Sequence, residues 1–334
     1  KCWTREQRYF VRVAHRQHET QAAQVSELLN MEDPIDVLVI GPVDGERSAE
    51  LVEMARRKGI KVMAYDRLIK KCTLDYYLSF DNALVGRMQA EYVALANHTK
   101  GNYVLLEGSP IDNNAHLFKS GHLAVLKPLI EKGDVKVVFE TFVDGWNAEL
   151  GKELFGAFLD ENPDLMISAV LAANDNLARG AYQALSERGR ESGVLITGQD
   201  SNLDACQRIV NDQQNMTVYK PIEAIAYSAA INAVKIAKGH PTEFDNTKVS
   251  INNETMEVPA ILMSPVLVDR TTMETTVIAD GYWTKEDIYP QGQPVETAEE
   301  ASDLLEEAPI EESTPETEES DELLEDMGLE DLGM

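Results

Sequence analysis

Polar side chains follow five short apolar runs in this sequence, at the points where buried strands are expected to end. One run, 169–172, is followed by Asn174 and Asp175. The other four runs are followed by Asp66-Arg67, Asp112-Asn113-Asn114, Gln199-Asp200 and Lys220. Ligands bind at the carboxyl ends of parallel strands in open α/β sheets. The five strand ends therefore predict one converging polar site.

These side chains suit a neutral polyol as ligand. Carboxylates and amides supply planar acceptors and donors for neighbouring hydroxyl groups, and Arg and Lys each donate several hydrogen bonds. One face of a pyranose carries C–H groups that pack against an aromatic ring. Trp146 follows the strand expected at 135–140 and so lies on the same rim, whereas Trp3 precedes the first predicted helix and is placed to form the opposite wall.

Motifs of several enzyme classes are missing from the sequence. It has no G-x-S-x-G, H-E-x-x-H or Walker motif, and its six His residues do not show metal-ligand spacing. The glycines at 41 and 45 follow a strand but lack the spacing of a dinucleotide fingerprint. Basic residues occur only in short clusters, which argues against nucleic acid as a partner. We therefore expect a binding protein that uses no metal and no cofactor.

Alternating strands and helices would position these side chains, and their order predicts parallel sheets with helical crossovers. Strands are expected near 36–40, 61–64, 76–79, 102–106, 135–140, 169–172, 194–197, 216–219, 247–251, 258–262 and 265–268. Helices are expected near 4–15, 19–30, 47–58, 82–97, 115–131, 148–161, 177–188, 203–211 and 221–238. Two α/β lobes fit this order better than one oversized sheet.

The net charge of −28 is concentrated at one end of the 334-residue chain. Residues 295–334 contain 17 Asp or Glu and no Lys or Arg, which leaves about −11 for the rest. A segment of this composition buries too little apolar surface to offset its chain entropy, so 291–334 is predicted to be a disordered acidic tail. No apolar run approaches the roughly 20 residues of a membrane span, and the three Cys residues show no pairing pattern.

Several ordered segments resemble the ribose/galactose-type family of periplasmic sugar-binding proteins, which serve bacterial ABC importers. They are DVLVIGPVDG (36–45), KVMAYDR (61–67), YLSFDN (77–82), GSPIDNN (108–114), VDGW (143–146), GQD (198–200) and TVYKP (217–221). The resemblance extends from about residue 3 to 283. GSPIDNN, VDGW and TVYKP are typical of the members that bind D-xylose rather than ribose or galactose.

The resemblance implies an α/β fold of two lobes, the type I periplasmic-binding-protein fold, in which each lobe is a parallel sheet flanked by helices. Such a protein closes on one monosaccharide, here D-xylose or a related sugar, and catalyses no reaction. The sugar-binding residues carried over from the family are Trp3, Asp66, Arg67, Asn113, Asn114, Trp146, Asn174, Asp200 and Lys220. The chain departs from the pattern at Cys2, where the family has Arg, and lobe one is expected to lack its first two strands.

The expected lobe one comprises residues 1–109 and 220–264, and the expected lobe two comprises 110–219 and 265–285. The chain should cross between the lobes near 109–110, 220–221 and 264–265, where Pro fixes the backbone φ.

Three functions fit this architecture. The first is a monomeric receptor that delivers the sugar to an ABC permease, in the periplasm or outside the cell, free or membrane-anchored. The second is a sensory module that presents its closed state to a histidine kinase or chemoreceptor. The third is the sugar-sensing core of a transcription regulator, although no helix-turn-helix segment or basic patch supports it.

Overall fold

A computed structural model describes residues 8–290 of the chain. The tail expected at 291–334, together with Cys2 and Trp3, lies outside the described residues. The α-helices are α1 His18–Leu29, α2 Ala49–Arg57, α3 Asn82–Ala96, α4 Asn113–Lys132, α5 Ala148–Glu161, α6 Asp175–Ser186, α7 Leu203–Val210, α8 Ile222–Ala237 and α9 Lys285–Ile288. Two shorter helical turns are η1 Asp144–Trp146 and η2 Glu274–Ile278.

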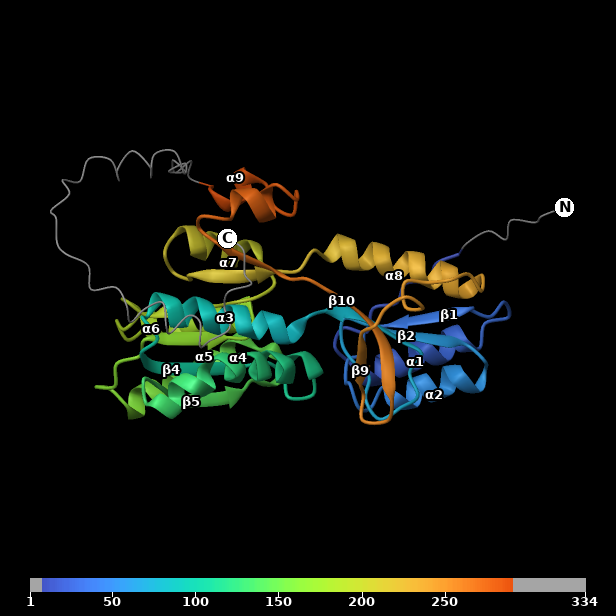
Figure 1. Cartoon of the computed structure of the whole chain (residues 1–334), viewed down its shortest axis with the longest axis horizontal. Coiled ribbons are helices and arrows are strands. Elements are labelled where there is room, and N and C mark those ends of the chain that lie inside the picture. The colour runs from blue at the N-terminus through green and yellow to red at the C-terminus, as the bar shows by residue number, and fades with distance from the viewer. Residues whose placement is uncertain (1–7, 291–334) are drawn as a thin grey trace. The chain divides into compact units, whose positions relative to one another are not determined.

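Within residues 8–290 the strands form three sheets. Their bounds are β1 Val37–Ile40, β2 Lys61–Tyr65, β3 Tyr76–Phe80, β4 Gly101–Glu107, β5 Val135–Phe142, β6 Ala169–Ala172, β7 Leu195–Ile196, β8 Met216–Tyr219, β9 Ser250–Asn252, β10 Glu257–Met263 and β11 Val266–Asp269. The first sheet has the order β1-β2-β3-β10-β9, the second β5-β4-β6-β7, and the third pairs β11 with β8. Figure 1 shows the first and second sheets as separate groups of elements.

The first sheet is parallel from β1 to β10, and the strand at its other edge, β9, pairs antiparallel with β10. Val62, Met63 and Ala64 in β2 are all buried, as expected for a central parallel strand that is covered on both faces. Helix α8 contacts β1, β2 and β3. Within residues 8–290, β1 pairs only with β2 and is therefore an edge strand of this sheet.

The second sheet is parallel throughout, and it corrects one expected lobe boundary. Strand β4 pairs with β5 on one side and with β6 on the other. Helix α3 packs on α4 and also contacts β6 and β8. Residues 82–107 thus belong with the second sheet, and the expected boundary at 109 is wrong. The chain leaves the first sheet between β3 and α3, because the apolar faces of α3 and β4 are buried against second-sheet elements.

We propose lobe boundaries that follow the sheets. Lobe one is then 18–80 with 221–263, and lobe two is 82–219 with 266–288. Strand β8 pairs with β11, whereas the helix that follows β8 packs on the first sheet. Strand β10 lies in the first sheet, and β11 leaves it for β8.

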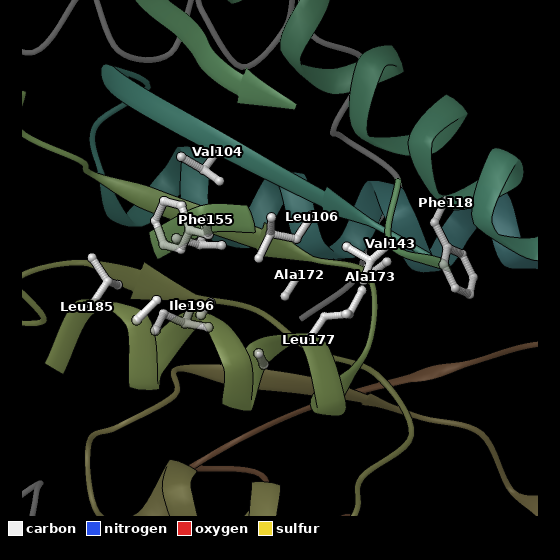
Figure 2. Packing of buried hydrophobic residues seen from close by; sticks show 14 of the residues in the cluster. Val104, Leu106, Phe118, Val143, Phe155, Ala172, Ala173, Leu177, Leu185 and Ile196 are labelled. Atoms are coloured by element: carbon white, nitrogen blue, oxygen red, sulfur yellow. The ribbon is translucent and has the colours of Figure 1, made fainter. Parts of the chain in front are cut away.

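A single apolar cluster fills one face of the second sheet. Figure 2 shows side chains of β4, α5 and α6 meeting there, among them Leu106, Phe155 and Leu177. Phe155 is fully buried and stacks with Phe139 of β5 at 6.3 Å between ring centroids. This packing fixes the strand ends that carry the polar side chains.

The helix expected at 4–15 is absent from the described part of that range, because residues 8–14 have no regular secondary structure. Tyr9 and Val13, which have helical spacing, are 63% and 60% exposed. An amphipathic helix draws most of its stability from burying its apolar face, and these side chains stay largely exposed. The segment instead lies over α1, where Gln24 Nε2 donates a hydrogen bond to the Val13 carbonyl oxygen. None of the helices in 8–290 is long and apolar enough to span a membrane.

Candidate functional site

One cavity of about 1310 Å³ extends from the carboxyl ends of the first and second sheets along the edge of β1, where residues 8–16, α1 and α8 also line it. Seven of the expected sugar-binding residues line it, and they come from both proposed lobes: Asp66, Arg67, Asn114, Trp146, Asn174, Asp200 and Lys220. Asn113 instead borders a smaller cavity of about 230 Å³. Trp3 lies outside the described residues.

Arg67 follows β2 and reaches across to the second sheet. Its Nε lies 2.7 Å from Oδ2 of Asp112, which precedes α4. The residue before it, Asp66, has a φ of 63°. The backbone carbonyl of Asp66 accepts hydrogen bonds from Ser79 Oγ at 2.6 Å and Tyr77 Oη at 3.2 Å, both in β3. These two bonds hold the turn that aims Arg67 into the cavity.

Asp112 is a buried carboxylate of the site; the sequence analysis placed it at a predicted strand end but did not select it as a sugar-binding residue. It is 2% exposed. Its Oδ1 caps α4 by accepting from Asn114 N, and its Oδ2 accepts from Trp146 Nε1 at 3.2 Å as well as facing Arg67. Burial raises the pKa of the carboxyl, and the Arg67 guanidinium opposes that shift. In the sequence, an Asp before a helix indicates only an N-cap.

Trp146 lies in a tight turn that presses its indole against a strand end. Gly145 and Trp146 have φ values of 60° and 57°. A Cβ on Gly108 would lie 2.0 Å from an indole carbon, so only Gly fits beneath the ring. The ring of Phe118 meets the indole edge-on at 6.1 Å between centroids. The indole is therefore fixed in orientation, with one side packed and the cavity beside it.

Asn174 and Asp200 approach each other from the ends of β6 and β7. Oδ1 of Asn174 caps α6 by accepting from Leu177 N at 3.0 Å. The cap turns Nδ2 of Asn174 toward Asp200, whose Oδ2 is 3.5 Å away. Burial raises the pKa of Asp200 to about 6, against the opposing charge of Lys220. The pair presents an amide donor and a carboxylate acceptor to the cavity.

Lys220 lies where the chain passes from β8 to α8 and is 9% exposed. Its Nζ donates to Asn82 Oδ1 at 2.7 Å and to Gln199 Oε1 at 3.1 Å, and it lies 4.9 Å from the centroid of the Phe118 ring. Burial lowers its pKa, while the charges of nearby carboxylates such as Asp66 and Asp200 act in the opposite direction. Lys220, in one segment that crosses between the sheets, is therefore fixed by side chains of lobe two.

Sequence reasoning also missed Asn82, whose Nδ2 donates to Asn114 Oδ1 at 2.9 Å. Asn82 is the first residue of α3 and follows the N-cap Asp81, so its sequence pattern is that of an ordinary helix start. Gln199 was part of a predicted strand end, but its neighbour Asp200 was the one selected.

The family of the chain is settled by a match between residues 4–241 and the model of the periplasmic binding protein domain. The chain belongs to the periplasmic binding protein family. A D-xylose-binding periplasmic protein of Haemophilus influenzae is 45% identical to it over 280 residues, covering 84% of this chain and 82% of the relative. The D-xylose-binding periplasmic protein of Escherichia coli is 43% identical over 274 residues, covering 82% and 81%.

Solved structures of other periplasmic binding proteins share the fold. An ABC transporter solute-binding protein from Clostridium phytofermentans with bound β-D-glucose has a TM-score of 0.77 and 29% identity, covering 82% of this chain and 88% of that chain. A carbohydrate transporter solute-binding protein from Chloroflexus aurantiacus in complex with D-glucose has a TM-score of 0.75 and 29% identity, covering 82% and 87%. The expected type I two-lobe fold is thereby confirmed.

A second carboxyl beneath the site should make the stability of this periplasmic binding protein depend on pH. Burial, and next the charge of Asp200, raise the pKa of Asp175 to about 7 from an ordinary value near 4. The folded state therefore binds the proton more tightly, so the stabilisation is complete below about pH 4 and is lost as pH rises through about 7. Across that range the free energy of unfolding should fall by up to about 1.4 kcal/mol per pH unit.

Urea unfolding of the wild type and Asp175→Asn between pH 4 and 8 measures this effect, because Asn cannot titrate. The difference between the two curves should shrink steadily as pH rises. Asp160→Asn is the control, since the Asp160 carboxylate is exposed and ion-paired with Arg188, which lowers its pKa. Parallel curves for the wild type and Asp175→Asn would contradict the assignment.

Proposed function

We propose that this protein binds D-xylose between its two lobes and delivers the sugar to an ABC importer, without catalysing a reaction. The observation that supports this most strongly is the convergence of Arg67, Asn114, Trp146, Asn174, Asp200 and Lys220 on one cavity. These residues follow six different strands, which belong to three sheets. The identity of about 45% to a D-xylose-binding relative points to the same sugar.

The side chains divide into an aromatic surface and a set of hydrogen-bonding groups. In our proposal the indole of Trp146 packs against the C–H face of the pyranose. Arg67, Asn174 and Lys220 donate to the sugar oxygens, and Asp200 accepts from a hydroxyl. A polar site of this kind rejects a sugar that lacks one of the matching hydroxyls, because the unmatched protein group would be buried without a partner.

Binding should be coupled to closure of the two lobes. The Arg67–Asp112 ion pair joins the end of β2 in the first sheet to the start of α4 in lobe two, and the Lys220–Asn82 hydrogen bond joins two of the segments that cross between the lobes. A sugar that contacts both lobes shifts the equilibrium toward the closed state. The size of that shift is set by the difference between its affinities for the closed and open states. We propose that the closed monomer is the form that the permease recognises, in the periplasm.

Titration calorimetry with D-xylose tests the proposal, with D-ribose, L-arabinose and D-glucose as comparators. We expect one-to-one binding with D-xylose tightest. Asp200→Asn should weaken D-xylose binding by about tenfold to a hundredfold, because a hydrogen bond to a charged acceptor contributes about 1.5–3 kcal/mol. Asp212→Asn is a matched control, since the Asp212 carboxylate pairs with Arg270 on the surface. A folded wild type that binds none of the four sugars would refute the proposal.

A further inference from the structure

Three fully buried polar side chains lie behind the binding site and touch none of its cavity. Gln89 is in α3, His122 in α4, and Glu107 is the last residue of β4, and each is 0% exposed. His122 Nε2 lies 2.7 Å from Gln89 Oε1, and its Nδ1 lies 3.1 Å from Glu107 Oε1. Burying polar groups in a core is costly unless they are hydrogen-bonded, and here the three side chains bond to one another while Glu107 Oε2 has no partner among the described residues.

The amide of Gln89 holds two strand ends together. Its Nε2 donates to the Ala172 carbonyl oxygen at 3.1 Å and to the Gly198 carbonyl oxygen at 2.9 Å. Ala172 precedes Asn174 by two residues, and Gly198 precedes Asp200 by two residues. One side chain thus ties the backbones that carry both members of the Asn174–Asp200 pair.

His122 supports one orientation of the Gln89 amide. Both hydrogens of the amide nitrogen are used by the two carbonyls, so Oε1 must accept, and His122 Nε2 must donate to it. His122 Nδ1 then faces the carboxyl of Glu107, and one proton lies between them. Turning the amide over would place its oxygen against two carbonyl oxygens. The two carbonyls thus set the orientation of the Gln89 amide, and a proton on His122 Nε2 supports the same orientation.

Two glycines allow α3 and α4 to approach closely enough for this contact. A Cβ on Gly86 of α3 would lie 2.0 Å from the Phe118 carbonyl oxygen, and a Cβ on Gly121 of α4 would lie 2.2 Å from the Ala83 carbonyl oxygen. Gly121 directly precedes His122. The close helix crossing thus places the imidazole against Gln89.

The loop that follows Gly198 contains residues in an unfavourable backbone conformation. Asp200 has a φ of 107° and Ser201 a φ of 52°, both unusual for residues with a side chain. Such conformations persist only where surrounding contacts enforce them. The Gly198 carbonyl that precedes this loop accepts from Val218 N at 3.2 Å as well as from Gln89.

We propose that Gln89, oriented by His122 and Glu107, is a positioning residue that sets the separation of Asn174 and Asp200 and thereby the affinity and selectivity for the sugar. The affinity part of this inference rests on the proposed sugar-binding function. The positioning part concerns the backbone and is testable without ligand.

The first test compares Gln89→Met with Asn253→Leu. Asn253 is a matched control because it is a fully buried amide whose Nδ2 also donates to two backbone carbonyls, those of Ile69 and Cys72, but in the first-sheet region and away from the cavity. Both variants should lower the unfolding midpoint. Only Gln89→Met should raise the Kd for D-xylose, by about tenfold to a hundredfold, and reduce the preference over L-arabinose. Equal Kd values for Gln89→Met and the wild type would overturn the proposal.

A second pair of variants tests the role of His122. His122→Phe removes the donor to Gln89 Oε1 and should weaken D-xylose binding, whereas His122→Gln supplies an amide donor and should restore most of the affinity. If His122 only filled space, the Kd would depend on side-chain volume, and His122→Gln would not restore the affinity for D-xylose. Equal losses in the two variants would contradict the orienting role.

Hydrogen exchange in the ligand-free protein separates this inference from the proposed function. In Gln89→Met the amides of Asp175 and Asp200, which donate to Gln199 and Val218 carbonyls, should exchange faster than in the wild type and in Asn253→Leu. If the wild type bound no sugar, this measurement would still decide the positioning role. Unchanged exchange at both amides would refute it.

Discussion

Trp146→Ala should weaken D-xylose binding by about thirtyfold or more, because Trp side chains in desolvated pockets contribute about 2 kcal/mol or more to binding. The variant removes the aromatic surface and also the Nε1 donor to Asp112, which leaves Oδ2 of that buried carboxylate with Arg67 alone. Titration calorimetry at a temperature where circular dichroism shows the variant folded measures the loss.

Trp146→Phe separates the two contributions. Phe keeps an aromatic face beside the cavity but has no donor for Asp112, so its Kd should fall between those of the wild type and Trp146→Ala. Tyr227→Ala is the control, since Tyr227 is 68% exposed on α8. Wild-type affinity in Trp146→Ala would show that the indole does not contact the sugar.

Phe155→Ala should lower the free energy of unfolding by about 3–5 kcal/mol while leaving the Kd for D-xylose nearly unchanged. Phe155 is fully buried in the cluster of Figure 2, where it packs between the second sheet and α6 and does not line the cavity. Its truncation removes a large apolar surface and leaves a void that a packed core cannot close. Urea unfolding gives the stability change, and calorimetry gives the Kd.

Phe158→Ala is the matched comparison, because Phe158 belongs to the same α5 helix and stacks with Phe139 at 4.7 Å but is only half-buried. Phe158→Ala should lower the free energy of unfolding by clearly less than Phe155→Ala does. Equal costs for the two variants would contradict the packing described for Phe155. A large change in Kd for Phe155→Ala would mean that the core and the site are coupled more tightly than their separation implies.

The strand ends were predictable from the sequence because a buried parallel strand and the polar loop after it have opposite compositions. The run 169–172 followed by Asn174 is one example, and 216–219 followed by Lys220 is another. The structure places both side chains at the same cavity. Local composition was sufficient here, since the rim position follows directly from strand direction.

Other features depend on contacts that the sequence does not encode locally. Asp112 and Asn82 sit at helix starts, so their sequence signal is that of capping, and only the crossing of the chain between sheets brings them to the cavity. The helix expected at 4–15 had suitable apolar spacing, but in the described part of that range Tyr9 and Val13 stay exposed and no helix forms. The boundary near 109 was misplaced because the sequence of β4 indicates a buried strand but not the sheet to which it belongs. Its partners β5 and β6 come later in the chain, so its neighbours in sequence do not identify that sheet.

The strand order of the first sheet has a consequence for synthesis on the ribosome. In that sheet β3 pairs with β10, so the pairing of Tyr77 with Ala260 cannot form until β10 has been synthesised. The second sheet, from β4 to β7, is complete when residue 196 has emerged. Domains fold as units as the chain appears, and pairing between distant segments is slow. Of these two sheets the first is therefore the later to be completed, and until β10 emerges β3 has an unpaired edge.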